Sequence, residues 1–116
     1  MCGFIASFGL QVKKSNFSKS LQHLKRRGPD SEGVWFEGKT FLACRRLAIF
    51  DLNKRSDQPL QSLCSRYQII FNGSIYNFKS LRNYLINKKI SLKTNSDTEV
   101  ILELYVLEGP KMIHKL

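Results

Sequence analysis

The stretch TFLACRRLAIF, residues 40–50, places two arginines inside a run that is otherwise mostly apolar. Together with GVWFE at 33–37, it predicts two strands joined by a tight turn at Gly38-Lys39. An arginine in such a strand needs a partner, because burying its charge unpaired is costly. The guanidinium fork of Arg46 suits a carboxylate, which either a protein Asp or Glu or a ligand could supply.

Two further strands are expected, one before this pair in the chain and one after it. The stretch GFIASFG at 3–9 reads as a strand that ends at Gly9. The stretch RYQIIF at 66–71 reads as another strand, which runs into Asn72-Gly73. Residues 51–65 are expected to form a polar loop.

Three stretches carry helical patterns. Residues 16–26 have apolar side chains at helical spacing, with Asn16 as the expected N-cap. A second helix begins at Asn77, and a third follows the capping box S-x-x-E at 96–99 and ends at Gly109-Pro110. Antiparallel strands interleaved with helices indicate an α+β chain.

The composition excludes several classes of protein. The 116 residues suffice for one small domain, and no apolar run approaches the roughly 20 residues that span a bilayer. No secretory signal is visible, so the cytoplasm is the default compartment and no membrane partner is expected. The 19 Lys and Arg residues against 9 Asp and Glu give a net charge of +10. Because the basic residues are scattered, a solvated surface, or one that meets an acidic partner or a lost domain, is favoured over a nucleic-acid partner.

The cysteines and histidines do not form a metal-binding pattern. Cys2, Cys44 and Cys64 are too far apart for a CxxC site, and His23 and His114 have no ligand spacing with them. No metal site is therefore expected, and the odd cysteine count favours free thiols. Cys44 and Cys64 are expected to be small buried hydrophobic residues.

Cys2 stands directly after the initiator methionine. Removal of Met1 would give one residue both a thiol and a free α-amino group, a group whose usual pKa of about 7.7–8.0 leaves a large neutral fraction. The amine could take the thiol proton and later return it to a leaving amine, so that one residue would supply both nucleophile and base. The alternative interpretation is an ordinary small residue at the start of a strand.

Two further positions could bind an amino acid beside such a nucleophile. Asn72-Gly73 marks either a hairpin turn or, because a helix follows quickly, a pair of N–H donors for a tetrahedral oxyanion. The helix dipole favours Asp97 at the start of its helix, but its carboxylate could also bind an ammonium group. With Arg46 for a carboxylate, these residues describe a pocket for the α-carbon end of an amino acid.

Several motifs in this order resemble one protein family. They are Cys-Gly at 2–3, RRGPDSEG at 26–33, RRLAIFDL at 45–52, QP at 58–59, FNGSIYNF at 71–78 and SDTEVIL at 96–102. Over essentially the whole chain, the pattern resembles the N-terminal glutaminase domain of glutamine-hydrolysing asparagine synthetases, which are class II glutamine amidotransferases. The resemblance implies the N-terminal-nucleophile hydrolase fold, an αββα sandwich of antiparallel sheets.

The resemblance also implies a chemistry and the residues that carry it. Cys2, freed of Met1, would attack the side-chain amide of L-glutamine, and the resulting thioester would be hydrolysed to glutamate and ammonia. Asn72 and Gly73 would form the oxyanion hole. The glutamine-binding residues that the family implies are Arg46, Leu47, Ala48, Ile49, Phe50, Asn72, Gly73, Ser74 and Asp97. The ammonia would amidate a carboxylate, aspartate in the namesake enzymes, in a synthetase domain that uses ATP and Mg²⁺.

Three features depart from the family pattern. Ser74 stands where the family has glutamate, which predicts weaker glutamine binding by about 1–2 kcal/mol. Arg26 stands where the family has histidine. The chain ends in a helical stretch, KMIHKL, so we expect residues 1–116 to be a C-terminally incomplete glutaminase domain that lacks the synthetase (ATP-pyrophosphatase) domain and binds no cofactor itself.

Two alternatives stay open from the sequence. The glutaminase part does not name the acceptor, which could instead be a sugar acid in surface-polysaccharide synthesis. A catalytically inactive remnant that binds a partner is also compatible with the sequence, because the chain is short and carries Ser74.

Overall fold

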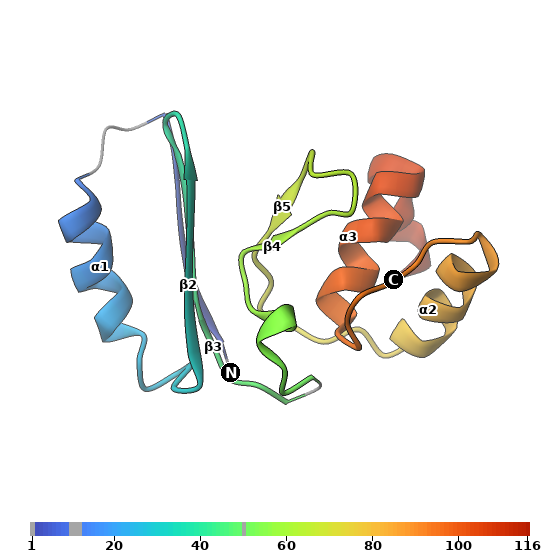
Figure 1. The fold of residues 1–116 in the computed structure, drawn as a ribbon, viewed down its shortest axis with the longest axis horizontal. Coiled ribbons are helices and arrows are strands. Elements are labelled where there is room, and N and C mark those ends of the chain that lie inside the picture. The colour runs from blue at the N-terminus through green and yellow to red at the C-terminus, as the bar shows by residue number, and fades with distance from the viewer. Residues whose placement is uncertain (1, 10–12, 50) are drawn as a thin grey trace.

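A three-stranded antiparallel sheet forms one side of the structure, a computed structural model that describes residues 2–9, 13–49 and 51–116. The strand order is β1-β3-β2, with β1 over Gly3–Phe8, β3 over Thr40–Arg46 and β2 over Ser31–Glu37. Helix α1, Lys14–His23, covers one face of this sheet (Figure 1).

The sequence predicts most of this half of the chain correctly. The strands expected at 3–9 and 33–37 agree with β1 and β2 to within two residues. The tight turn between β2 and β3 is present, with Gly38 at a φ of +55°. The prediction of Asn16 as the N-cap of the first helix is wrong, because α1 already begins at Lys14 and no side chain caps that end.

Strand β3 ends earlier than predicted. The strand expected over 40–50 stops at Arg46, because β2 begins opposite Arg46, at Ser31, and β1 does not extend beyond that point. The next N–H group, that of Leu47, bonds to the Sγ atom of Cys2 instead of a neighbouring strand. The end of β3 is therefore set by where its neighbours begin.

The second half of the chain is mostly helical. Strands β4, Leu60–Gln61, and β5, Gln68–Ile69, form a short antiparallel pair. Helix α2 spans Phe78–Asn87, and helix α3 spans Asp97–Glu108. Two 3₁₀ helices, η1 over Lys54–Ser56 and η2 over Gly109–Lys115, lie in the loop after β3 and at the end of the chain. The mixture of helices and antiparallel strands confirms the α+β class.

The start of α3 follows half of the predicted capping box. The Ser96 hydroxyl accepts a hydrogen bond from the Glu99 N–H at 3.2 Å, as expected. The Glu99 carboxylate does not reach back to Ser96 but accepts from the N–H groups of Thr94, at 2.7 Å, and Lys93, at 2.8 Å. Glu99 thereby holds the segment that precedes the helix against its first turn.

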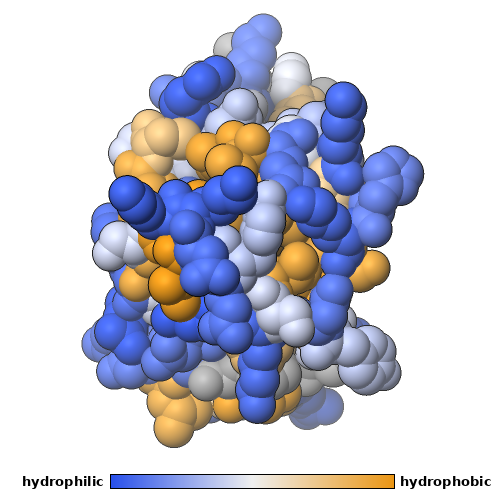
Figure 2. Space-filling model, turned by 90° about the vertical axis from the view of Figure 1, so that its right-hand side faces the viewer, coloured by the Kyte–Doolittle hydropathy of each residue, from blue (hydrophilic) through white to orange (hydrophobic). Residues whose placement is uncertain are grey.

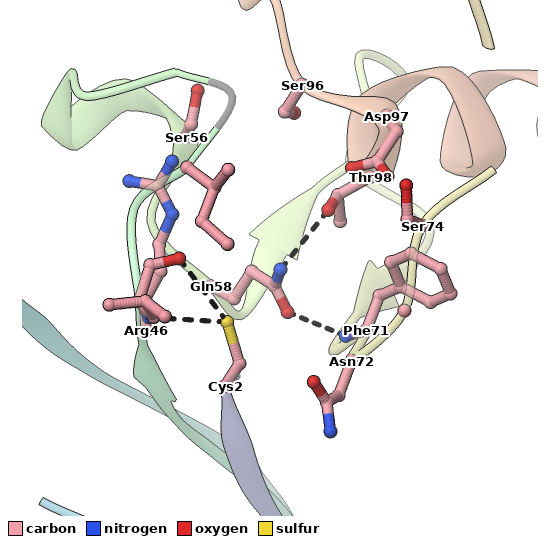
Figure 3. Close-up of a pocket in the computed structure, with 13 residues that line it drawn as sticks. Cys2, Arg46, Ser56, Gln58, Phe71, Asn72, Ser74, Ser96, Asp97 and Thr98 are labelled. Carbon is pink, nitrogen blue, oxygen red and sulfur yellow. Dashed lines mark hydrogen bonds between the residues drawn. The ribbon is translucent and has the colours of Figure 1, made fainter. Parts of the chain in front are cut away.

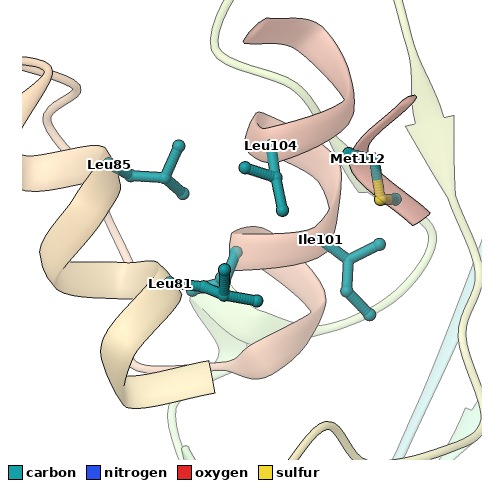
Figure 4. Packing of buried hydrophobic residues seen from close by; sticks show 6 residues of the cluster. Leu81, Leu85, Ile101, Leu104 and Met112 are labelled. Carbon is teal, nitrogen blue, oxygen red and sulfur yellow. The ribbon is translucent and has the colours of Figure 1, made fainter. Parts of the chain in front are cut away.

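Buried apolar side chains of the described residues gather in two clusters. Under α1, Phe17 and Leu21 pack on Ala43 of β3. The larger cluster lies between α2, α3 and η2 (Figure 4) and consists of Leu81, Leu85, Val100, Ile101, Leu104 and Met112. Because apolar burial is the main stabilising term in folding, each half of the chain has its own source of stability.

The surface on the α2 side is largely hydrophilic, with separate apolar side chains between the polar ones (Figure 2). Ile86 of α2 and Ile113 of η2 are among the exposed apolar residues. In residues 2–9, 13–49 and 51–116, no helix has the length and apolar character needed to cross a membrane.

The cysteines outside the N-terminus differ in environment. Cys44 is buried in β3, as predicted, and burial together with the nearby Cys2 thiol raises the pKa of the Cys44 thiol to about 12. Cys64 is exposed, so the prediction that it is buried is wrong. It lies in the turn between β4 and β5, where a hydrogen bond with the Ser62 hydroxyl lowers the pKa of the Cys64 thiol.

Truncation of Leu104 tests whether the helical cluster stabilises the fold. Leu104 is fully buried, whereas Leu107 on the same helix is 42% exposed. We expect Leu104→Ala to lower the free energy of unfolding by about 2–5 kcal/mol and Leu107→Ala by less than about 1 kcal/mol, because only the first change leaves a cavity. Urea denaturation followed by circular dichroism measures both values. Equal losses in the two variants would contradict this packing.

Alkylation by iodoacetamide should separate Cys64 from Cys44. The thiolate is the form that iodoacetamide alkylates. Because the pKa of Cys64 is lowered, Cys64 should be alkylated at a lower pH than an ordinary thiol. A pKa of about 12 leaves on the order of 10⁻⁴ of the Cys44 thiol ionised at about pH 8. Peptide mass mapping after short pulses should show Cys64 modified first and Cys44 protected until urea unfolds the chain. Similar labelling of both thiols in the folded protein would refute this difference.

Candidate functional site

A cavity of about 290 Å³ lies between the Arg46 end of the sheet and the first turn of α3 (Figure 3). Its walls come from segments far apart in sequence: the residue before β1, the end of β3, the segment after β5 and the start of α3. The structure brings together here the predicted site residues Cys2, Arg46, Leu47, Ile49, Asn72, Gly73, Ser74 and Asp97. Ala48 is next to the cavity but not part of its lining, and Phe50 lies outside the described residues.

The thiol of Cys2 is held against the backbone that follows β3. The Leu47 N–H donates to Sγ at 3.3 Å, and the thiol lies 3.7 Å from the Leu47 carbonyl oxygen. The Cys2 carbonyl accepts from Nε of Arg27 at 3.3 Å. The Ala48 N–H donates to the Asp30 carboxylate at 2.8 Å, which fixes the segment that contacts the thiol.

The guanidinium of Arg46 is buried and paired within the protein. Its Nη1 donates to the Asp57 carboxylate at 3.0 Å and to the Asn53 carbonyl at 3.4 Å. Its Nη2 donates to the Asp51 carbonyl. Asp57 also accepts from the Ser31 hydroxyl at 2.7 Å. Of the two kinds of partner that the sequence leaves open, a protein carboxylate is present, and the arginine also borders the cavity.

Asp51 connects this end of the sheet to α3. Its buried carboxylate accepts from the N–H and the side-chain amide of Asn53, at 3.0 and 2.9 Å, and from the Asn95 N–H at 2.9 Å. These hydrogen bonds, that of the Asn95 N–H above all, hold the pKa of Asp51 well below its usual range. Asn95 immediately precedes Ser96 and Asp97, so the Asp51 carboxylate fixes the start of the helix beside the cavity.

Asn72-Gly73 lies in a loop that leads to α2, so the hairpin interpretation is wrong. The Phe71 N–H donates to Oε1 of Gln58 at 2.6 Å, which takes this backbone out of strand pairing. The strand predicted over 66–71 is accordingly reduced to β5. A Cβ atom at Gly73 would lie 2.7 Å from the tip of the Phe71 ring, so any larger residue there would require that ring to shift.

Asp97 begins α3 and presents an unsatisfied oxygen. The residue is 5% exposed, and its Oδ2 has no hydrogen-bond partner among the described residues. Burial raises the pKa of the Asp97 carboxyl, while hydrogen bonds from the backbone N–H groups of Ile75 and Thr98 oppose that rise. A buried acceptor without a partner is costly, and a cationic donor in the cavity would relieve that cost.

Gln58 lines the cavity, although the sequence marks it only as part of the QP motif and predicts no role for it in the site. Its side chain is buried, with Oε1 on the Phe71 N–H and Nε2 3.2 Å from Oγ1 of Thr98. Ser56 and Ser96 also line the cavity without having been predicted there. The QP pair belongs to the motifs quoted above, but one polar residue in a loop carries no periodic signal. Only its contacts across the fold reveal it.

Comparison with known proteins identifies one domain family for this chain. The model of the glutamine amidotransferase domain family matches residues 1–116. The chain is 38% identical over 120 residues to a glutamine-hydrolyzing asparagine synthetase of Triphysaria versicolor, and the match covers 100% of this chain and 20% of that relative. It is also 38% identical to glutamine-hydrolyzing asparagine synthetase 3 of Arabidopsis thaliana, with the same coverage.

A bacterial relative gives the same result. The chain is 38% identical over 111 residues to glutamine-hydrolyzing asparagine synthetase 1 of Bacillus subtilis (strain 168), covering 90% of this chain and 17% of that relative. The chain thus spans about one fifth of the length of the curated relatives that it matches. Since the family match extends over every residue, the chain belongs to the glutamine amidotransferase domain family.

Proposed function

We propose that this chain is the glutamine-hydrolysing part of an asparagine synthetase-like enzyme. The observation that carries the proposal is the meeting of Cys2, Arg46, Asn72 and Asp97 around one cavity. A guanidinium and a carboxylate with an unpaired oxygen can hold the charged end of an amino acid. A thiol and an amide donor can attack its side-chain amide and stabilise the oxyanion that forms. Membership of the amidotransferase family supports the same chemistry.

In the proposed reaction, removal of Met1 frees the α-amine of Cys2. The amine accepts the thiol proton, and Sγ bonds to the amide carbon of L-glutamine while the carbonyl electrons move to oxygen. Collapse of this tetrahedral oxyanion breaks the carbon–nitrogen bond, and the leaving group takes the proton from the α-ammonium of Cys2 and departs as ammonia. Water then attacks the glutamyl thioester, which releases glutamate and restores the thiol.

Backbone and side-chain donors would stabilise the charges that form. The Asn72 side-chain amide and the Gly73 N–H would donate to the oxyanion, a contribution that is large when the donors are fixed in advance. The Leu47 N–H, which already donates to Sγ at 3.3 Å, would stabilise the thiolate.

Glutamine would be held at its α-carbon by two opposite charges. Oδ2 of Asp97, unpaired among the described residues, would accept from the α-ammonium group. The Arg46 guanidinium carries five N–H donors, of which Asp57, Asn53 and Asp51 accept three, so two are left for the α-carboxylate. Leu47 and Ile49 would cover the aliphatic part of the side chain.

We also propose that the fold is the αββα sandwich of N-terminal-nucleophile hydrolases. Figure 1 shows the layers α1, sheet β1-β3-β2, pair β4–β5 and α3 in this order. Phe4 and Phe8, on the sheet face opposite α1, are 48% and 67% exposed, and the groove beside them is lined from the other side by Tyr67 and Ile69. Two sheets whose apolar faces lie opposite each other across this groove have the layer order of such a sandwich.

The ammonia would serve an amidation elsewhere in a longer protein, because the chain spans only 20% of relatives that are named asparagine synthetases. Those names favour aspartate as the acceptor over a sugar acid. ATP and Mg²⁺ would be bound by the synthetase domain, since the hydroxyls, amides and open carboxylate around this cavity do not form a set that fits them. Among the described residues, no group of three or more His, Cys, Asp and Glu side chains is placed to hold a metal ion.

Removal of the nucleophile should abolish glutamine hydrolysis. We expect Cys2→Ala to release glutamate at the uncatalysed background rate, because no other group is proposed to form the thioester. Cys64→Ala, which removes an exposed thiol outside the cavity, should keep the wild-type rate. A coupled glutamate assay on protein whose intact mass lacks Met1 measures all three proteins. Equal glutamate release by the wild type and Cys2→Ala would favour the inactive remnant.

Substitution of Ser74 tests how the α-ammonium group of glutamine is bound. A carboxylate at this position would give the ammonium a second acceptor beside Asp97, so Ser74→Glu should lower KM for glutamine by about 5–30-fold, or about 1–2 kcal/mol. Ser74→Gln adds a similar side chain without charge and should not lower KM. Steady-state kinetics of the three proteins give the comparison. The same KM in Ser74→Glu and Ser74→Gln would argue against ammonium binding here.

A further inference from the structure

Gln58 contacts two walls of the cavity through one side-chain amide. The residue is only 6% exposed. Its Oε1 accepts from the Phe71 N–H at 2.6 Å, and its Nε2 donates to Oγ1 of Thr98 at 3.2 Å (Figure 3). The thiol of Cys44 lies 3.8 Å from the same Oε1. One planar group thus joins β3, the segment after β5 and the first turn of α3.

The orientation of this amide is determined by its partners. The Phe71 N–H can only donate, so the oxygen of Gln58 faces Phe71 and the NH₂ group faces Thr98. The backbone of Gln58 is fixed as well, because it packs on Gly33 of β2 so closely that a Cβ atom there would lie 2.0 Å from the Gln58 carbonyl oxygen. Because both its backbone and its amide are fixed, Gln58 sets the distance between the Phe71 N–H and the Thr98 hydroxyl.

The two partners depend on Gln58 to different degrees. The start of α3 is held independently by the Asn95 N–H on Asp51 and by the Ser96 cap. Among the described residues, the backbone of 71–74 has no strand partner. The Phe71–Gln58 hydrogen bond holds its start, and the Ile75 N–H that follows its end bonds to Asp97. Loss of the Gln58 amide would therefore displace the Asn72-Gly73 segment more than Asp97.

We propose that Gln58 is a positioning residue that holds Asn72 and Gly73 at the distance from Asp97 at which they can bind the oxyanion. This inference rests on the proposed glutaminase function. The oxyanion forms only during the chemical step, whereas the α-ammonium and α-carboxylate groups are bound throughout. Misplaced oxyanion donors therefore reduce kcat far more than they raise KM.

The first test is a split between kcat and KM. Gln58→Leu removes both hydrogen bonds and should lower kcat by about 10–100-fold while KM for glutamine changes by less than about threefold. The matched control is Gln61→Leu, because Gln61 is exposed on β4 and its side chain bonds to the Ser65 carbonyl at 3.4 Å, outside the cavity. An unchanged kcat in Gln58→Leu, or a loss confined to KM, would overturn the proposal.

Gln58→Glu adds a signature that a purely structural role would not give. The protonated carboxyl has one acceptor and one O–H donor, as the amide does, whereas the ionised carboxylate has no donor for Thr98 and repels the oxyanion. Burial raises the pKa of such a carboxyl, so the ratio of variant to wild-type kcat should rise as the pH is lowered from about 8 to about 6. A ratio that is constant or that falls, with equal melting temperatures at each pH, would count against positioning.

Hydrogen exchange separates this inference from the proposed function. If the wild type releases no glutamate, the proposed function fails, but the exchange rate of the Phe71 amide still reports on Gln58 without substrate. Its exchange should be at least about tenfold faster in Gln58→Leu than in the wild type and unchanged in Gln61→Leu. Equal protection in all three proteins would overturn the positioning role. Should Gln58→Leu not fold, Gln58→Met, whose unbranched side chain also lacks the amide that accepts from the Phe71 N–H, gives the same comparison.

Discussion

The buried charge of Arg46 imposes the arrangement on which the rest of the structure depends. A guanidinium at the end of a central strand, 6% exposed, has to be neutralised, because an unpaired buried charge is strongly destabilising. Asp57 supplies the carboxylate, and carbonyl groups of the same loop accept further donors, so the chain after β3 folds back over the strand end. That loop then presents the Asp51 carboxylate to Asn95, which fixes the start of α3 beside the sheet.

In this arrangement, the two apolar clusters and the cavity occupy different parts of the structure. Apolar burial is concentrated under α1 and between α2 and α3, and the cavity lies between the two clusters. The unpaired Oδ2 of Asp97, which would be costly inside an apolar core, belongs to a residue that lines this cavity. The thiol of Cys2 and the Asn72-Gly73 loop reach the same space from separate elements. The Leu47 N–H holds the thiol, and the Gln58 side chain holds the backbone just before Asn72.

Local sequence patterns correctly predict those elements whose formation depends on neighbouring residues in the chain. The mostly apolar run at 3–9 predicts β1, which spans Gly3–Phe8, and capping chemistry predicts the start of α3 after Ser96. The motif residues predicted for the site, Ala48 and the undescribed Phe50 apart, meet at one cavity. Features set by distant segments were not predictable. Strand β3 ends where its neighbours begin, Cys64 is exposed by the turn between β4 and β5, and Gln58 bonds to residues 13 and 40 positions away.

Acid quenching of the protein during turnover of L-glutamine, followed by peptide mass mapping, tests most directly whether Cys2 is the nucleophile of this site. The predicted result is a glutamyl group linked as a thioester to a peptide that begins with Cys2. A glutamyl group on Cys64 instead, or glutamate release by protein that retains Met1, would contradict the central claim.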